Sequence, residues 1–224
     1  MQKHISGAFD TELEELKTTF TELGGLAERQ VADAMTAFFT NDSELATTVK
    51  STELQINRHA LELDKRAEFV IARRQPAATD LRLLVSILKS STDLERVGDE
   101  AERIAKLADR LSVYDSNRPY HDYLQELSNG TSIALRESLD CFARLDVEQA
   151  LQTIAGDREI DSLYDSVVKH ATKEMKKVPK KVTNSLAIIW VARSLERISD
   201  HAKNICQTVV YLVHGQMIIH NLFE

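Results

Sequence analysis

Apolar residues recur at three- and four-residue steps along almost the whole chain. The first stretch shows this over Leu13, Leu16, Phe20 and Leu23. Such spacing places the apolar side chains on one face of an α-helix. The pattern is interrupted at Gly24-Gly25 and resumes through Phe38. We therefore expect one long amphipathic helix, with a kink as the simplest interpretation of the two glycines.

Polar residues and prolines divide the rest of the pattern into further helices. The stretch NDSELA at 41–46 offers N-cap residues for a second helix. Gln75-Pro76 ends that helix, because the residue before a proline avoids the α region. Pro119 suits the first turn of a fourth helix. The expected ranges after the first helix are about 41–74, 77–111, 119–145, 147–177 and 182–214.

The second half of the chain repeats the first. DLERVGDEAERI at 93–104 returns as SLERISDHAKNI at 194–205, with Leu, Glu, Arg, Asp, Ala and Ile identical. Pro76 and Pro179 precede the third helix of each half and lie 103 residues apart. Internal repetition of this kind indicates two copies of one structural unit. The predicted fold is all-α, with two tandem antiparallel three-helix bundles at 1–112 and 113–224.

Composition and charge narrow the class of protein. The 224 residues include 7 Gly and 3 Pro and are 43% apolar, which favours helices over sheets. A formal charge of −7 argues against nucleic-acid binding. The start, MQKHISGAFDTELEEL, lacks the apolar core of a secretory signal, and the longest apolar run, 186–192, is too short to cross a bilayer. We expect a cytoplasmic protein that meets membranes only peripherally, through partners, and whose cysteines, Cys141 and Cys206, are reduced.

Acidic residues occupy the helix face opposite the apolar stripe in both copies of the repeated stretch. On a helical wheel Glu95, Asp99 and Glu102 lie opposite Leu94 and its stripe, and Glu196 and Asp200 repeat the arrangement. The acids should therefore lie on the outer surface of each bundle. Two carboxylates four residues apart repel by a few tenths of a kcal/mol, and a bridging cation would remove that repulsion.

More acids lie on the neighbouring helix of the second half, at Asp157, Asp161 and Asp165. If their flank borders the last helix, Asp161 and Asp165 converge with the two acids of that helix. Clusters of oxygen ligands suit Mg²⁺, Mn²⁺, Ca²⁺ or iron. The alternative is a solvated acidic surface in which Arg96 and Arg197 form ordinary ion pairs with neighbouring acids.

A basic turn closes the fifth helix. KEMKKVPKK at 173–181 contains five lysines around Pro179. One interpretation is a solvated loop. The other is contact with an acidic partner surface or with an anionic membrane leaflet.

The sequence shows no recognisable catalytic motif. None of the seven histidines has Glu three residues before it, as a ferritin-like di-iron centre requires. His201, beside Asp200, is either a metal donor or a surface histidine. The sequence contains neither a glycine-rich phosphate loop nor a recognisable Ser-His-Asp or Cys-His arrangement. We therefore expect a protein that is not an enzyme. A carboxylate-bridged metalloenzyme, such as a metal-dependent phosphatase, is the rival interpretation and would need acids that point inward.

Two long stretches carry a family resemblance. RRQPAATDLRLLVSILKSSTDLERVGDEAERIA at 73–105 and LERISDHAKNICQTVVYLVHG at 195–215 resemble the signature blocks of the PhoU family. The resemblance implies a cytoplasmic, dimeric protein of two three-helix bundles. It also implies a negative regulator of phosphate uptake and phosphate-starvation signalling, whose partners are the ATPase subunit of the phosphate ABC transporter and the phosphate sensor histidine kinase. An accessory of another transporter or signalling system is the alternative.

The resemblance also implies iron or zinc clusters bound through E/D-x-x-x-D motifs, with Mg²⁺, Mn²⁺ and Ca²⁺ left open. The predicted metal ligands are Glu95 and Asp99 in the first half, and Glu196, Asp200, Asp161 and Asp165 in the second. The first half departs from the pattern, since Asn57 and Leu61 replace Asp161 and Asp165 at an offset of 104. Glu53 is retained there in the place of Asp157. The second half is therefore the better candidate metal site.

Overall fold

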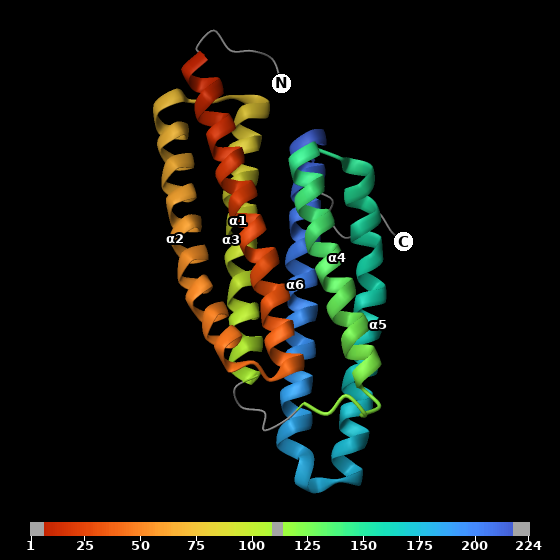
Figure 1. The fold of residues 1–224 in the computed structure, drawn as a ribbon. Coiled ribbons are helices and arrows are strands. Elements are labelled where there is room, and N and C mark those ends of the chain that lie inside the picture. Colours follow the sequence, from red (N-terminus) through yellow and green to blue (C-terminus); the bar gives the residue numbers. More distant parts are fainter. Residues whose placement is uncertain (1–6, 109–113, 217–224) are drawn as a thin grey trace.

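The computed structural model describes residues 7–108 and 114–216, which form long α-helices and one short 3-10 turn (Figure 1). Within these ranges no residue lies in a β-strand, which confirms the all-α prediction. The elements are α1 (Gly7–Thr40), α2 (Ser43–Arg74), α3 (Ala78–Ala108), α4 (His121–Arg144), α5 (Val147–Lys177), η1 (Pro179–Lys181) and α6 (Val182–His214). Over the same residues, no helix is both long enough and apolar enough to span a bilayer.

The helix ends follow the capping residues that the sequence supplies. The side chain of Asp42 accepts hydrogen bonds from the backbone N–H groups of Glu44 and Leu45 at the start of α2. Gln75 takes a left-handed conformation and ends the same helix before Pro76. One boundary was wrong: α4 begins at His121, so Pro119 lies in the preceding turn. The predicted end of the third helix, Leu111, lies outside the described residues.

Two glycines permit helices to approach one another closely. α1 continues unbroken through Gly24, where a Cβ would lie 2.5 Å from Cδ2 of Leu139 in α4. In α3, a Cβ at Gly98 would overlap Oε2 of Glu53 in α2. Gly24 therefore serves the contact between the bundles, and Gly98 leaves room for a buried carboxylate.

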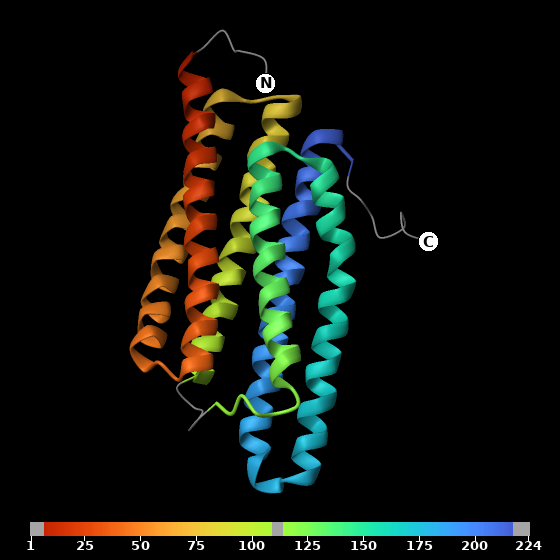
Figure 2. The ribbon, with the colours of Figure 1, turned by 45° about the vertical axis from the view of Figure 1, so that its right-hand side comes forward.

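The six α-helices of the described ranges group into two bundles that lie side by side. α1, α2 and α3 pack on one another, as do α4, α5 and α6, and Figures 1 and 2 show the two groups next to each other along their length. This confirms the two-bundle fold, although the predicted division at 112/113 lies outside the described residues. The predicted stripe is buried in both copies, with Leu94, Ile104, Leu195 and Ile205 fully buried.

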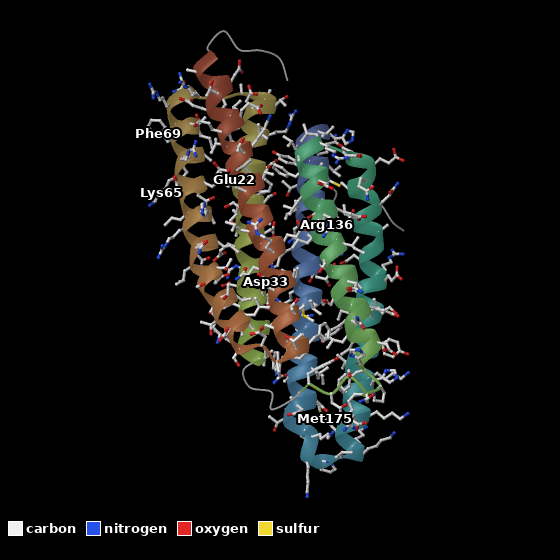
Figure 3. All side chains as sticks on the ribbon, viewed as in Figure 1. Glu22, Asp33, Lys65, Phe69, Arg136 and Met175 are labelled. Carbon is white, nitrogen blue, oxygen red and sulfur yellow. The ribbon has the colours of Figure 1, made fainter. Side chains whose placement is uncertain are left out.

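The bundles are joined by α3 against α6 and by α1 against α4, which are the inter-bundle contacts of the described helices. The first contact gives α3 and α6 a central position, because each packs on its own bundle and on the other. In the second, Arg136 of α4 donates to Glu28 of α1 over 2.7 Å; Figure 3 labels Arg136.

The α3–α6 seam contains a buried carboxylate. Glu100 is only 2% exposed. It accepts hydrogen bonds from Ser194 Oγ at 2.9 Å and from Arg103 Nη1 at 2.8 Å, and it pairs with Arg197 Nε at 3.0 Å. Arg197 therefore pairs across the seam and not with an acid of its own surface. Burial of this carboxylate is tolerated because charged and neutral donors satisfy both of its oxygens.

A second polar contact crosses the seam at the positions related to the first by the internal repeat. Asp93 Oδ1 lies 2.9 Å from His201 Nδ1 and accepts from Asn204 Nδ2 at 3.1 Å. At the offset of 101 residues, Asp93 corresponds to Ser194 and Glu100 corresponds to His201. The duplicated helices thus meet about an approximate two-fold axis, with both acids of the two pairs on α3 and their partners on α6. Neither His201 nor Arg197 was predicted to lie in this interface.

The two cysteines are buried neighbours from α4 and α6. Both are free thiols, and Cys141 is 1% exposed while Cys206 is fully buried. A hydrogen bond between the thiols, together with burial, raises the pKa of Cys206 and keeps it protonated. The pair belongs to the core of the second bundle.

Replacement of Gly98 by alanine tests the close packing of α2 on α3. Overpacking against Glu53 is expected to lower the free energy of unfolding by about 1–3 kcal/mol, although alanine itself favours the helix by about 1 kcal/mol. The matched control is Gly156→Ala in α5, where nothing lies within 4 Å of the new Cβ, and stability should rise by about 0.5–1 kcal/mol. Urea unfolding measures both, and a Gly98→Ala protein as stable as the control would contradict the packing described.

Candidate functional site

The acids of the second half lie along the border between α5 and α6. We call Asp157, Asp161, Asp165, Glu196 and Asp200 the α5–α6 acidic face. The pKa of Asp161 is raised by burial and then by the negative charges of Asp157, Asp200 and Asp165. The acidic flank of α5 therefore borders α6, which was the condition for these acids to converge, and the carboxylates of the two helices lie close enough to repel one another.

Glu196 lies deeper than the helical wheel predicted. Its side chain is 13% exposed, and Oε1 accepts a hydrogen bond from Arg193 at 2.6 Å. Oε2 is buried and has no hydrogen-bond partner among the described residues. Burial raises the pKa of Glu196, as do the charges of Asp200 and Asp161. The outward position was wrong for this residue, because the neighbouring helices cover its side chain.

Asp157 contacts Ser199 and Lys203, two partners that the sequence pattern did not indicate. It is 4% exposed, and Oδ1 accepts a hydrogen bond from Ser199 at 3.0 Å. Oδ2 forms an ion pair with Lys203. The pKa of Lys203 is raised: burial opposes its charge, but the bond to Asp157 and the nearby acids outweigh that cost. Lys203 is thus a cation built into the acidic face, placed there by its position one turn after Ser199.

The remaining acids of this face are exposed to solvent. Asp161, Asp165 and Asp200 all lie on the surface, as predicted. As the side chains stand, the described residues contain no group of three or more His, Cys, Asp or Glu arranged to hold a metal ion. A cation bound here would therefore require these carboxylates to rotate toward it.

The corresponding face of the first half, between α2 and α3, is less acidic. Glu53 is 4% exposed and accepts from Gln30 Nε2 at 3.1 Å, while its Oε1 has no partner among the described residues. Burial raises the pKa of Glu53, with smaller contributions from Asp99 and Glu102. The position equivalent to Asp165 carries Leu61, which is 56% exposed.

The predicted ligands Glu95 and Asp99 have a cation beside them. Arg96 donates to Asp99 Oδ2 at 3.1 Å and lies 3.6 Å from Glu95 Oε2. This is the ordinary ion pair that the sequence allowed as an alternative. His201 is also accounted for, since its Nδ1 contacts Asp93 in the seam.

Comparison with known proteins identifies the family. A model described as "PhoU domain" matches the chain twice, at residues 20–108 and 124–209. The chain belongs to the PhoU family. It is 41% identical, over 97% of its length and 85% of the relative, to a protein of Pseudomonas putida named phosphate-specific transport system accessory protein PhoU homolog. It is 36% identical, over 98% of its length and 91% of the relative, to phosphate-specific transport system accessory protein PhoU of Escherichia coli strain K12.

Two solved structures share the fold. The crystal structure of PhoU from Pseudomonas aeruginosa superimposes with a TM-score of 0.89 at 40% identity, covering 93% of this chain and all of that one. The phosphate transport system regulatory protein PhoU from Streptococcus pneumoniae gives a TM-score of 0.87 at 28% identity, covering 94% and 99%. The two PhoU domains thus correspond to the two bundles of the duplicated fold.

The raised pKa of Glu196 predicts how stability depends on pH in the presence of a chelator. Because the folded protein holds this proton more tightly than the unfolded chain, the contribution of Glu196 is most favourable below the ordinary glutamate pKa of 4.5. It declines as the pH rises through the raised pKa. Glu196→Gln should remove this decline and raise the free energy of unfolding at pH 7.

Urea unfolding at several pH values between about 4 and 7 measures this effect. The matched control is Glu159→Gln, since Glu159 is exposed on the side of α5 that faces α4. If Glu196→Gln follows the wild-type profile as closely as the control does, the buried carboxylate does not carry the cost inferred from its surroundings.

Proposed function

We propose that this protein is a negative regulator and adaptor of phosphate uptake and phosphate-starvation signalling. The observation that carries the proposal is the double PhoU-domain match, supported by relatives that align over nearly the full chain and are named as accessory proteins of the phosphate-specific transport system. In this proposal it works without catalysis, in the cytoplasm and as a homodimer. Its partners are the ATPase subunit of the phosphate ABC transporter and the phosphate sensor histidine kinase.

The proposal includes metal ions on the α5–α6 acidic face. The residues that would hold an ion are Asp161, Asp165, Glu196 and Asp200. Two features support this. Glu196 Oε2 is buried and has no hydrogen-bond partner among the described residues, and burial, followed by the charges of the neighbouring acids, raises the pKa of Asp161 and of Glu196. A cation would supply positive charge to these oxygens and reduce the repulsion. Oxygen-only donors favour iron, Mn²⁺, Mg²⁺ or Ca²⁺ over zinc, which more often takes His or Cys ligands.

The α2–α3 face is the weaker candidate for metal binding. Glu95 and Asp99 form the second E/D-x-x-x-D pair, but Arg96 already neutralises much of their charge. Leu61 and Asn57 also remove two oxygen ligands that the other face has. In the proposal, this face binds metal more weakly than the α5–α6 face or through fewer ligands.

Metal binding is tested by thermal unfolding after removal of bound ions. At an ion concentration about a hundred times its Kd, a ligand of the folded state should raise the Tm by about 5–10 °C. The double variant Asp161→Asn with Glu196→Gln should lose most of this shift. The control, Glu95→Gln with Asp99→Asn, should keep most of it. If no ion among Fe²⁺, Mn²⁺, Zn²⁺, Mg²⁺ and Ca²⁺ shifts the wild-type Tm, the metal proposal fails.

The regulatory role is tested by disrupting the gene and by co-purification. Loss of the protein should raise expression of a phosphate-starvation reporter in phosphate-replete medium. A tagged protein from the same medium should recover the phosphate transporter ATPase and a sensor histidine kinase. An unchanged reporter together with recovery of a different transporter would contradict the phosphate role and indicate an accessory of another system.

A further inference from the structure

The hairpin formed by α5 and α6 projects beyond the rest of the molecule. Figures 1 and 2 show the lower ends of these two helices extending past the ends of the other helices. Met175 in α5, labelled in Figure 3, lies in this projecting part. We call residues 173–190, which contain the end of α5, η1 and the start of α6, the hairpin tip.

Large apolar side chains are exposed along one face of the hairpin tip. Val182 is 39% exposed, Leu186 is 45% exposed and Trp190 is 60% exposed. Their four-residue spacing places them in a row along α6. Trp190 is the single tryptophan of the chain and the most exposed large apolar side chain among the described residues. The row is therefore a continuous feature and not a scattered set of surface residues.

The same tip is strongly basic in a protein whose formal charge is −7. Residues 173–181 contain five lysines and one acid, Glu174, which is buried and paired with Arg118. Lys181 lies 3.5 Å from Asp115. The other four lysines are exposed and have no acidic partner within the described ranges: Lys173, Lys176, Lys177 and Lys180. Positive charge is thus concentrated at one end of the molecule.

We propose that the hairpin tip binds directly to the surface of an anionic lipid bilayer. In this interaction Trp190 and Leu186 enter the headgroup region, and the lysines lie near the lipid phosphates. Tryptophan with flanking lysines is the composition that favours a membrane–water interface. Each lysine close to an anionic leaflet strengthens binding about fivefold. A projecting tip can reach a flat surface without obstruction from the other helices.

The charge distribution favours one orientation on the bilayer. Glu196 lies six residues beyond Trp190 on α6, or about 9 Å further along the helix axis. The acidic face that begins there is repelled by anionic lipid. The protein would therefore contact the bilayer through the exposed face of the hairpin tip, with the α5–α6 acidic face beyond the edge of that contact. This binding does not depend on the proposed regulatory role.

Vesicle binding tests the proposal with the full chain. The protein is mixed with vesicles of phosphatidylglycerol and phosphatidylcholine, or of phosphatidylcholine alone, with a chelator present so that divalent ions cannot bridge acids to lipid. We expect co-sedimentation and a shift of tryptophan emission to shorter wavelength only with the anionic vesicles. Because Trp190 is the only tryptophan, the shift reports on the tip itself.

Charge-reversal variants locate the binding surface. Lys176→Glu, Lys177→Glu and Lys180→Glu together should weaken vesicle binding at least about 100-fold. The control combines Arg29→Glu, Arg58→Glu and Lys65→Glu, three exposed cations of α1 and α2 with the same total change of charge. It should keep vesicle binding within about tenfold, with tryptophan emission still shifted. Circular dichroism confirms that both triple variants are folded.

Three results would overturn the proposal. The first is absence of binding and of an emission shift with anionic vesicles. The second is an equal loss of binding in the control variant, which would indicate attraction spread over the whole surface. The third is a tip variant that loses a co-purified acidic protein while the wild type ignores vesicles, which would make the tip a protein-binding site.

Discussion

The packing of α3 against α6 is the contact on which the rest of the structure depends. It joins the two copies of the repeated unit, and two acid-containing pairs cross it: Glu100 with Ser194 and Asp93 with His201. The E/D-x-x-x-D pairs lie on these same two helices, with Glu95 and Asp99 on α3 and Glu196 and Asp200 on α6. The seam therefore positions the helices that carry the acidic pairs.

Electrostatic repulsion distinguishes the two faces. On the α5–α6 face the acids outnumber the cations beside them, and burial adds to the free-energy cost of charging Glu196. Lys203 offsets part of that cost by pairing with Asp157. On the α2–α3 face Arg96 lies between two acids, and an exposed leucine replaces a third. Duplication therefore preserved the scaffold while the charge of its two faces diverged, which is why the α5–α6 face is the stronger candidate for binding a cation.

Local signals in the sequence predicted most of the fold. Side-chain capping by Asp42 and the steric effect of Pro76 act within a few residues, and the repeat revealed two similar bundles. The burial of individual side chains and their hydrogen-bond partners were harder to predict, because both depend on residues far apart in sequence. The wheel treated α6 as a single helix and so missed the burial of Glu196. The contact of His201 with Asp93 spans 108 residues and crosses between bundles, and no local pattern indicates it.

The stability of the Glu100→Ala variant tests the role of the seam most directly. Removal of this carboxylate leaves the buried Ser194 hydroxyl without its acceptor and Arg197 without its partner. We predict a loss of about 2 kcal/mol in the free energy of unfolding, measured in urea. Glu14→Ala, which removes an exposed ion pair with Lys17, should cost less than about 0.5 kcal/mol. Equal stability of the two variants would contradict a seam stabilised by the buried carboxylate of Glu100.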